Sequence, residues 1–561
     1  MTTSKNSLSK KWWKEQIIYQ IYPRSFFDSD GDGIGDLNGI IEKLDYIKSL
    51  GVTAVWVNPF YASPNDDNGY DISDYRKIMD EFGDMNDFDE MIKGFHQRGI
   101  KFIMDLVVNH SSDEHEWFKQ SRSSRYNLYR DYYHWWPAEK GKPNHRFSYF
   151  DEKGDAWKYD QQTDSYYLHY FSAKQPDLNW ENPELRREIY DIMHFWAKKG
   201  VDGFRLDAFQ FISKDTTFPA FPEGYQDDVV DVIKHHGMGP TLHNHIREMN
   251  QEVLSKYEVF AVSEGAGSSF EDAHSLVDED RNELHMVYHF EGVEIGNGLD
   301  DPHTLADFKE VHSKWEEAFK DKGWISIFLA NHDVPRMVSR FGNDSDEFRA
   351  VSSKMLNTFI LTMRGTPYCY FGDELGMKNI YFEDINEYQD IAAINGYKKA
   401  LSEGKDMQKF MQNLRFYSRD NSRTPMQWDN TENAGFTSGS PWISVNSDYK
   451  EVNVASQENR ADSVLNHFRT LTKLRTENDI LVYGVYQQVE PDHPHIYAYT
   501  RSLDNQTWLV ILSFVETDAN LKLPNNMQTF EIQANNYSQL SIDDGWLKLK
   551  PYQAVVLSQK E

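Results

Sequence analysis

The stretch Val201-Asp202-Gly203-Phe204-Arg205-Leu206-Asp207-Ala208 reads as a short buried strand that follows a helix end at Lys198-Lys199-Gly200. A carboxylate, Asp207, stands where the apolar run stops, and burying a charge is costly unless it is paired. The guanidinium of Arg205, two residues earlier, would keep this carboxylate ionised, because a nearby opposite charge favours the charged form. An ionised, oriented carboxylate at the end of a rigid strand can act as a nucleophile. A purely structural Arg–Asp ion pair is the alternative.

Similar apolar runs recur along the chain, with helix-like segments between them. The eight runs are Gln16–Tyr22, Val52–Asn58, Lys101–Asn109, Val201–Asp207, Val259–Glu264, Leu284–Phe290, Trp324–Asn331 and Thr366–Gly372. Helical spacing precedes the third run at Asp87–Arg98 and the fourth at Pro183–Lys199. This alternation predicts an α/β fold with a parallel sheet. Eight repeats favour a (β/α)8 TIM barrel, whose active site lies at the carboxyl ends of the strands.

Two parts of the chain break the barrel pattern. Residues 110–175 are rich in Trp, Tyr, His and Ser, with turn signals at Glu152-Lys153-Gly154 and Thr163-Asp164-Ser165, and they predict a small inserted domain after the third strand. Short alternating runs follow Asp479 and predict a C-terminal antiparallel β-sandwich. Those runs are Ile496–Thr500, Trp508–Phe514, Phe530–Ile532 and Ala554–Leu557. The predicted domains are therefore a barrel from residues 1–109 and 176–479, an inserted domain at 110–175 and a C-terminal domain at 480–561.

Composition excludes several classes of protein. The net charge of −30 argues against nucleic acid and anionic membranes as partners. Aromatic residues make up 14% of the chain, which suits flat surfaces that contact sugars, although most of them will fill cores. The single cysteine, Cys369, excludes an internal disulfide and a cysteine-based metal site. Because Met1–Lys14 lacks an apolar core and no run could span a bilayer, we expect a cytoplasmic protein. We expect it to be a monomer or a homodimer.

Polar residues stand at the ends of four predicted strands. Besides Asp207, they occur in Asp105–His110, Val262–Glu264 and Leu329–Asp333. Because these strand ends converge on one barrel mouth, the repetition predicts a shared pocket. Two carboxylates that face each other across a substrate are the machinery of glycoside hydrolysis.

These four stretches resemble the four sequence motifs of the α-amylase superfamily, glycoside hydrolase family 13. Three more stretches resemble its oligo-1,6-glucosidase and α-glucosidase branch, and the resemblance extends across nearly the whole chain. They are Gln175-Pro176-Asp177-Leu178-Asn179, Asn65-Asp66-Asp67-Asn68-Gly69-Tyr70-Asp71 and Ser418-Arg419-Asp420-Asn421-Ser422-Arg423-Thr424-Pro425-Met426-Gln427-Trp428. The resemblance implies a retaining exo-α-glucosidase that acts on the non-reducing end of short α-glucosides.

The resemblance also implies catalytic roles. Asp207 matches the nucleophile, Glu264 the general acid/base, and Asp333 the third carboxylate, which holds the sugar hydroxyls. The implied substrate-binding residues are Asp67, Tyr70, His110, Phe150, Phe171, Gln175, Arg205, Ala208, His332 and Arg423.

Within the implied binding set, Tyr70 matches an aromatic platform beneath the bound glucose. Asp67 and Arg423 match a salt bridge that closes the pocket floor, with Arg419 as the alternative partner of Asp67.

Ala208 bears on linkage preference. Relatives that prefer α-1,6 bonds typically carry Val after the nucleophile, whereas those that accept α-1,4 bonds carry Ala or Thr. Since a small side chain leaves room for the closer second sugar of an α-1,4 bond, we expect activity on maltose and malto-oligosaccharides. Oligo-1,6-glucosidase activity is the first alternative. Transglucosylation or sucrose isomerisation is the second, although the arginine-rich loop of the isomerases is missing at Glu291-Gly292-Val293-Glu294-Ile295-Gly296.

A non-enzymatic binding relative is the remaining alternative. Such proteins usually lose the carboxylates and carry a membrane span, and this chain keeps the first and lacks the second.

The acidic stretch Asp28–Asp36 predicts a cation site. Its oxygen donors would be the carboxylates of Asp28, Asp30, Asp32 and Asp36 and the carbonyl of Ile34, at positions 1, 3, 5, 9 and 7. Because position 12 is Gly39 and not a bidentate Glu, an isolated structural Ca2+ loop fits better than an EF-hand. Mg2+ could substitute, and a hydrated acidic turn without an ion is the alternative.

Overall fold

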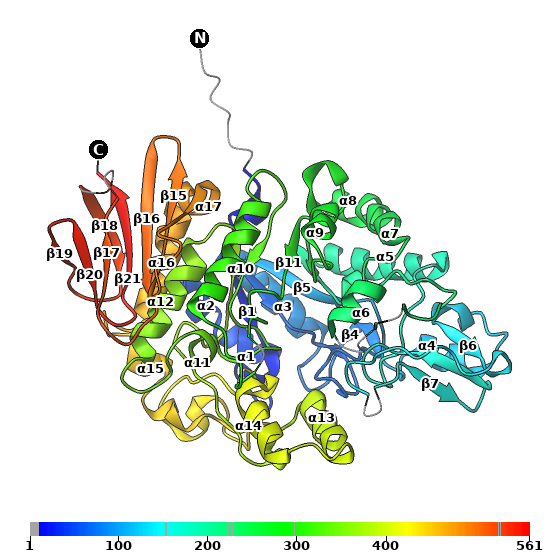
Figure 1. Cartoon of the computed structure of the whole chain (residues 1–561). Helices are drawn as coiled ribbons and strands as arrows, with labels where there is room; N and C mark the ends of the chain where they lie inside the picture. Colours follow the sequence, from blue (N-terminus) through cyan, green and yellow to red (C-terminus); the bar gives the residue numbers. More distant parts are fainter. Residues whose placement is uncertain are drawn as a thin grey trace, which may run out of the picture.

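The computed structural model describes residues 10–151, 154–222, 224–225, 229–296, 298–524, 527 and 529–560. The predicted turn at Glu152-Lys153-Gly154 therefore lies largely outside the described residues. The centre of the molecule is a parallel sheet of eight strands (Figure 1). These are β1 (Ile18–Ile21), β2 (Ala54–Val57), β5 (Lys101–Val107), β9 (Gly203–Asp207), β10 (Phe260–Glu264), β11 (Met286–Tyr288), β12 (Ser326–Ile327) and β13 (Thr366–Tyr370). Each strand lies within one of the eight predicted runs.

The sheet closes on itself as a barrel. Its strand order is β11-β10-β9-β5-β2-β1-β13-β12, and a parallel bridge between Val287 and Ile325 connects its two ends. Nearly all strand residues are buried on both faces, as a sheet inside a ring of helices requires. The prediction of a TIM barrel from continuous apolar runs is confirmed.

Two of the helices around the barrel begin at residues whose side chains cap the first turn. Helix α3 (Met85–Gln97) begins at a capping box on Asp84, and α5 (Pro183–Lys198) begins at Asn182 with proline in its first turn. Both match their predicted segments. The other helices between barrel strands are α1 (Leu37–Glu42), α2 (Leu44–Ser49), α6 (Val229–His236), α7 (Leu242–Met249), α8 (Ser255–Tyr257), α9 (Phe270–Val277), α10 (Leu305–Ala318), α11 (Met337–Phe341) and α12 (Arg349–Thr362).

An inserted unit follows β5, the third barrel strand. It holds α4 (Glu116–Ser123) and an antiparallel sheet in the order β6 (Trp135–Pro137), β8 (Ser165–Leu168) and β7 (Trp157–Asp160). This unit projects from one side of the barrel, opposite the C-terminal strands (Figure 1). A shorter hairpin, β3 (Tyr61–Ala62) with β4 (Asp74–Ile78), follows β2.

A long segment after β13 carries two helices that the sequence did not single out. They are α13 (Ile391–Ser402) and α14 (Met407–Tyr417), which lie beside each other at one end of the barrel (Figure 1). The chain then returns through α15 (Val454–Gln457), α16 (Val464–Glu477) and α17 (Asp479–Tyr483).

The C-terminal region forms two antiparallel sheets. One has the order β14 (Val485–Val489), β15 (Ile496–Leu503), β16 (Gln506–Ser513), β21 (Ala554–Gln559) and β18 (Phe530–Asn535), and the other has β17 (Ala519–Lys522), β20 (Trp546–Leu549) and β19 (Ser541–Asp543). Apolar residues of both sheets share one core, so the predicted β-sandwich is confirmed. The sequence prediction missed β14, β17, β19 and β20, which are short or partly exposed.

Among the described residues, no helix combines the length and the apolar character needed to cross a membrane.

Candidate active site

A cavity of about 230 Å3 opens at the carboxyl ends of the barrel strands. It is smaller than the ~300–1,000 Å3 of typical drug-sized ligand sites, so it suits a small ligand. The lining residues are Asp67, Tyr70, His110, Tyr149, Phe150, Phe171, Asp207, Ala208, Gln210, Phe211, Ile233, Glu264, Phe290, Glu294, Asp333, Val334 and Arg419. All three predicted catalytic carboxylates are among them.

Two adjacent strands place Asp207 and Glu264 next to each other. Asp207 is the last residue of β9 and Glu264 is the last residue of β10, and Leu206 pairs with Ser263 one step earlier. Ala208 then turns the chain with a left-handed φ of 47°. Its backbone N–H donates to Glu264 Oε2 at 2.9 Å, so the turn that follows Asp207 positions the Glu264 carboxylate.

One buried guanidinium connects three carboxylates. Arg205 donates from Nη1 to Asp105 at 3.0 Å and to Asp207, and from Nη2 to Glu264. The predicted contact between Arg205 and Asp207 is confirmed. Because Arg205 is fully buried, it neutralises charge where water cannot.

Two opposing influences act on the protonation of Asp207, namely burial and the neighbouring Arg205. Burial raises the pKa of Asp207 to about 7, although Arg205 acts in the opposite direction. Burial likewise raises the pKa of Glu264 to about 8, against Arg205 and with the charges of Asp207 and Asp333 adding to the shift. Both carboxyl groups therefore bind a proton more readily than a carboxyl group in water does.

The pKa of Asp333 shifts in the opposite direction. Burial alone would raise its pKa, but His332, Arg419 and Arg423 together hold the pKa of Asp333 well below its usual range. Both arginines donate to Asp333 Oδ1 at 3.0 Å. Asp333 is therefore a fixed negative charge in the cavity wall.

At the floor of the cavity, the arginine that pairs with Asp67 is not the predicted Arg423. Asp67 lies 3.4 Å from Arg419, which also pairs with Asp333 and Asp390. Arg423 contacts Asp333, Asp390 and the His332 carbonyl but not Asp67. The physical reason is the 3-10 turn at Arg419–Asn421, which directs the earlier arginine to Asp67.

Aromatic rings from the inserted unit form one wall. Phe171 lies 4.9 Å from His110 and stacks on Tyr149 at 5.1 Å between ring centres. Phe150 covers Arg419 with its ring centre 4.9 Å from the guanidinium carbon. These flat apolar surfaces face a polar floor, an arrangement that suits a pyranose ring with one apolar face.

The family model described as "Alpha amylase, catalytic domain" matches residues 20–484. This chain belongs to the α-amylase family. A second family model, "Alpha-amylase SusG C-terminal domain", matches residues 496–556.

Relatives match over nearly their whole length. An oligo-1,6-glucosidase from Parageobacillus thermoglucosidasius is 49% identical, covering 98% of this chain and 99% of that protein. An α-glucosidase from Pediococcus pentosaceus is 43% identical, covering 97% and 98%. The solved structure of an isomaltulose synthase from Klebsiella sp. LX3 has a TM-score of 0.94 and 42% identity, covering 98% of this chain and 100% of that one. This member of the α-amylase family is a glycoside hydrolase.

Six of the ten predicted substrate-binding residues line the cavity of this glycoside hydrolase, namely Asp67, Tyr70, His110, Phe150, Phe171 and Ala208. The other four, Gln175, Arg205, His332 and Arg423, are buried behind them and hold them in place. Gln175 donates to Asp67 at 3.0 Å and lies 3.2 Å from His110, whereas His332 contacts the Tyr70 hydroxyl at 2.7 Å. The predicted contact of these four residues with substrate stays a prediction.

Several lining residues were missed by the sequence prediction. Tyr149, Gln210, Phe211 and Val334 lie within three residues of predicted positions, so proximity in sequence was an available signal. Phe290 ends a predicted strand and Glu294 follows it. Nothing in the sequence pointed to Ile233.

The acidic loop brings three of its four predicted carboxylates together. Asp28, Asp30 and Asp36 each offer an oxygen, and these oxygens lie within 4.8 Å of one another. Asp32 lies outside this group, and its Oδ1 accepts the N–H of Ile34 at 2.8 Å. Its role as a ligand stays a prediction. The carbonyl of Ile34 stays a prediction. The donor set contains only oxygen atoms, which suits Ca2+ or Mg2+.

Proposed function

We propose that this enzyme is a retaining exo-α-glucosidase that releases glucose from the non-reducing end of short α-glucosides. The observation that carries the proposal is the pair Asp207 and Glu264, bridged by Arg205 in a small cavity with a charged floor.

The two carboxyl groups divide the chemistry between them. Asp207 attacks the anomeric carbon as a carboxylate, while Glu264 protonates the leaving oxygen; Glu264 then takes a proton from the water that hydrolyses the glucosyl-enzyme. The pKa of about 7 for Asp207 and about 8 for Glu264 supports this division, because the nucleophile loses its proton before the acid does.

A retaining mechanism is supported by the shared arginine. Both carboxylates bind the same planar guanidinium, so their oxygens lie within a few ångströms of each other. Retaining enzymes need a separation of about 5–5.5 Å, whereas inverting enzymes need about 6.5–9.5 Å to admit a water molecule.

Exo action is supported by the cavity floor. Asp67, Arg419 and Asp333 form this charged floor, to which a sugar hydroxyl can bind. A further glucose unit beyond that floor would have to displace buried ion pairs, which is strongly unfavourable.

The linkage preference rests on two separate observations. The names of four relatives at 46–49% identity, all oligo-1,6-glucosidases, favour α-1,6 bonds. Ala208 is a small residue that lines the cavity beside the proposed nucleophile, and it leaves room for the second sugar of an α-1,4 bond. We infer that the enzyme cleaves isomaltose-type bonds and accepts maltose-type bonds as well.

Sucrose isomerisation is the second candidate function, because isomaltulose synthases are among the structurally similar proteins. The segment Glu291–Gly296, which follows the sixth barrel strand, contains no arginine. That absence favours hydrolysis.

One experiment tests these proposals together. Maltose, isomaltose, sucrose, trehalose, kojibiose and nigerose are incubated with the enzyme, and the products are followed by NMR that resolves the anomers. We expect α-glucose as the first product from maltose and isomaltose. β-Glucose would exclude retention, isomaltulose or trehalulose from sucrose would favour isomerisation, and internal cleavage of cyclodextrin would exclude the closed floor.

We further propose that the acidic loop holds a structural Ca2+, with Mg2+ as a possible substitute. Asp28, Asp30 and Asp36 would hold the ion. Its charge would compensate three neighbouring carboxylates, and no catalytic step depends on it.

A further inference from the structure

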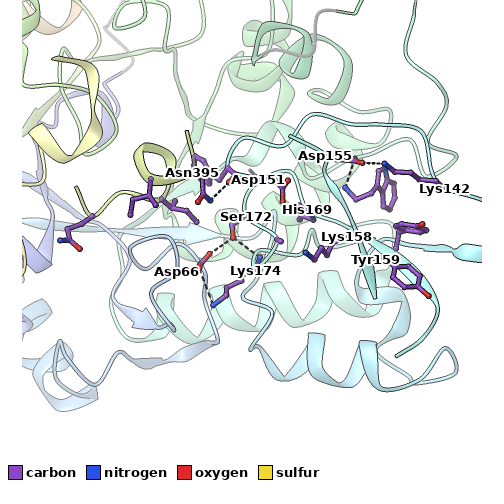
Figure 2. Close-up of a pocket in the computed structure, with 17 residues that line it drawn as sticks. Asp66, Lys142, Asp151, Asp155, Lys158, Tyr159, His169, Ser172, Lys174 and Asn395 are labelled. Atoms are coloured by element: carbon purple, nitrogen blue, oxygen red, sulfur yellow. Dashed lines mark hydrogen bonds and ion pairs between the residues drawn. The ribbon is translucent and has the colours of Figure 1, made fainter. Parts of the chain in front are cut away.

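Helix α13 contacts both the floor and the aromatic wall of the catalytic cavity from outside. Asp390, the residue before its first turn, pairs with Arg419 of the floor, and Asn395 binds the backbone of Phe150 in the wall. Asn395 and Phe150 also line a separate cavity of about 910 Å3, in which Figure 2 shows Asn395 beside the inserted unit. Among the described residues, those that line the catalytic cavity include neither Asp390 nor Asn395. The two side chains therefore act on that cavity only through other residues.

Asp390 stands at the N-cap position of α13 but does not cap the helix. An aspartate at this position usually accepts a backbone N–H of the first turn, which stabilises the helix. Here the side chain accepts no such bond from the described residues of that turn. Its Oδ1 and Oδ2 each lie 3.1 Å from Arg419 Nε, and Arg419 Nη2 also donates to Oδ1. The carboxylate therefore holds the guanidinium of Arg419 and leaves the end of its own helix uncapped.

The backbone fixes the start of α13 against the turn that carries Arg419. The N–H groups of Gln389 and Asp390 donate to Asp420 Oδ2 at 2.8 and 3.0 Å. Asp420 directly follows Arg419 in the same 3-10 turn. An arginine side chain has many rotamers, and a fixed carboxylate behind it reduces their number. Asp390 therefore keeps the guanidinium where it also pairs with Asp333 in the cavity.

Asn395 holds the aromatic wall just over one helical turn later. Its Nδ2 donates to the Phe150 carbonyl at 2.9 Å. The ring centre of Phe150 lies 4.9 Å from the guanidinium carbon of Arg419, so the ring covers the cation that Asp390 binds. The strength of a cation–π contact depends on this distance. One helix therefore holds both partners of the contact between Phe150 and Arg419.

Packing makes α13 a firm support for these contacts. Ala393 of α13 is buried in an apolar cluster with Phe382, Tyr388 and Ile443. Close-packed side chains resist displacement, because any shift opens voids or causes overlap. The position of α13, and with it that of Asp390 and Asn395, is therefore set by the rest of the molecule.

We propose that α13 positions the catalytic cavity for glucose binding, with Asp390 acting through Arg419 and Asn395 acting through Phe150. The inference rests on the proposed function, because it takes the bound sugar to be glucose. Arg419 and Phe150 contact the sugar before and during the reaction. Loss of their support should therefore weaken binding of the ground state and the transition state alike, so KM rises and kcat changes little.

The test measures glucose binding by isothermal titration, which needs no turnover, together with KM and kcat on p-nitrophenyl α-glucoside. Asn395→Ala in the full-length enzyme should raise KM and the Kd for glucose by about 2- to 10-fold. Asp390→Asn, which keeps the shape but removes the charge, should raise both by about 10-fold. In each variant kcat should stay within about 3-fold of the wild-type value.

Asn413→Ala is the matched control for Asn395→Ala. Asn413 lies on the neighbouring helix α14, where its Oδ1 accepts the Leu299 N–H at 3.2 Å, and it does not line the catalytic cavity. This variant also loses a side-chain contact between a helix and a distant segment. Its KM and its Kd for glucose should stay near the wild-type values.

Phe150→Ala shows whether Asn395 acts through the aromatic ring. This variant removes the ring but keeps the backbone carbonyl that Asn395 binds. If Asn395 positions the ring, adding Asn395→Ala to Phe150→Ala should change the Kd for glucose by less than about 2-fold, because both substitutions remove the same interaction. A purely structural role of Asn395 would give additive effects instead.

Additive effects in the double variant, or an unchanged Kd for glucose in both single variants, would overturn the proposal. A lower melting temperature with unchanged KM would also overturn it, since Asp390 and Asn395 would then support only the fold. A wild type that binds glucose but hydrolyses no α-glucoside would contradict the proposed function. The positioning roles would then be decided by the titrations alone.

Discussion

Arg205 donates to Asp105, Asp207 and Glu264 at once, so three buried carboxyl groups depend on one cation. Burial pushes all three carboxyl pKa values up, and the arginine restrains each shift. Because Arg205 and burial affect each group differently, two neighbouring carboxyl groups can serve the proposed roles of nucleophile and general acid. This is how one strand end and its neighbour can supply both halves of a hydrolysis.

The pH dependence of kcat/KM follows from these pKa values. Activity requires Asp207 ionised and Glu264 protonated, so kcat/KM should rise through about pH 7 and fall above about pH 8. Glu264→Gln should lower kcat on maltose by about 10²–10⁴-fold. The loss should be much smaller on p-nitrophenyl α-glucoside, whose leaving group needs little protonation, and the alkaline decline should disappear there.

Circular dichroism of the Glu264→Gln enzyme serves as the folding control. Equal losses on both substrates with an intact fold would contradict the role of Glu264 as acid.

Ala208→Val should change linkage preference. Two added methyl groups beside the leaving-group sugar should disfavour maltose relative to isomaltose by about 1–3 kcal/mol, or roughly 5- to 150-fold in the ratio of kcat/KM values. The left-handed φ of 47° makes a β-branched residue strained here. That strain affects both substrates equally and cancels in the ratio, while the melting temperature reports it separately. An unchanged ratio would show that Ala208 does not determine linkage.

At the scale of single elements, two short segments bring charged side chains close together. They are the 3-10 turn at Arg419–Asn421 and the acidic loop after β1. The turn presents Arg419 to Asp67, Asp333 and Asp390 together. A structural element this short has no core of its own, so ion pairs with the rest of the molecule fix its position.

Arg419→Gln should therefore affect both stability and binding. Unpairing buried carboxylates costs about 3–5 kcal/mol of folding free energy. Loss of a charged hydrogen-bond partner in the cavity should lower kcat/KM by roughly 10- to 100-fold. Arg122→Gln is the control, because Arg122 pairs with buried Asp160 in the inserted unit away from the cavity. The Arg122 variant should have a lower melting temperature and a kcat/KM near the wild-type value. A similar loss of kcat/KM in both variants would contradict a role of Arg419 in substrate binding.

Removal of the proposed Ca2+ should lower thermal stability more than turnover. An ion present at 100 times its Kd stabilises the folded state by about 2.7 kcal/mol. A chelator should thus lower the melting temperature of the wild type, and Asp30→Asn should abolish most of this shift. Asp80→Asn, at an exposed aspartate outside the loop, should leave it intact. Rapid reversible loss of activity without a thermal shift would point to a catalytic ion.

At the scale of the whole molecule, a buried lysine joins the inserted unit to the barrel. Lys214 Nζ lies 3.1 Å from Asp177, at the return from the inserted unit, and donates to Asn109 at 3.0 Å, at the exit from β5. Both ends of the insertion therefore meet one cation. This junction keeps the aromatic wall over the catalytic carboxylates.

Lys214→Met should cost about 3–5 kcal/mol, since it leaves Asp177 buried and unpaired. Lys199→Met, which breaks the exposed pair with Asp89, should cost no more than about 1 kcal/mol. Thermal unfolding measures both, and limited proteolysis should cut the inserted unit first in the Lys214 variant. Equal thermal stability of the two variants would rule out this junction as a structural anchor.

The barrel and the position of its strand-end carboxylates could be predicted from the sequence. Buried parallel strands are continuous apolar runs, and a carboxylate at the end of such a run can only lie at the barrel mouth. The pattern therefore placed Asp207 and Glu264 in one pocket, and the resemblance to glycoside hydrolase family 13 supplied their predicted roles. The same logic gave the inserted unit and the C-terminal sandwich.

Which side chains contact one another could not be predicted from the sequence. Arg419 and Arg423 are four residues apart in one motif, and the turn between them alone selects Arg419 as the partner of Asp67. Burial likewise decides the pKa of Asp207, because the effect of a neighbouring arginine depends on how much water remains. Residues of β7, β8 and α13 line one cavity of about 910 Å3, although α13 lies more than 200 residues after β8. Proximity between such distant segments leaves no pattern in a single sequence.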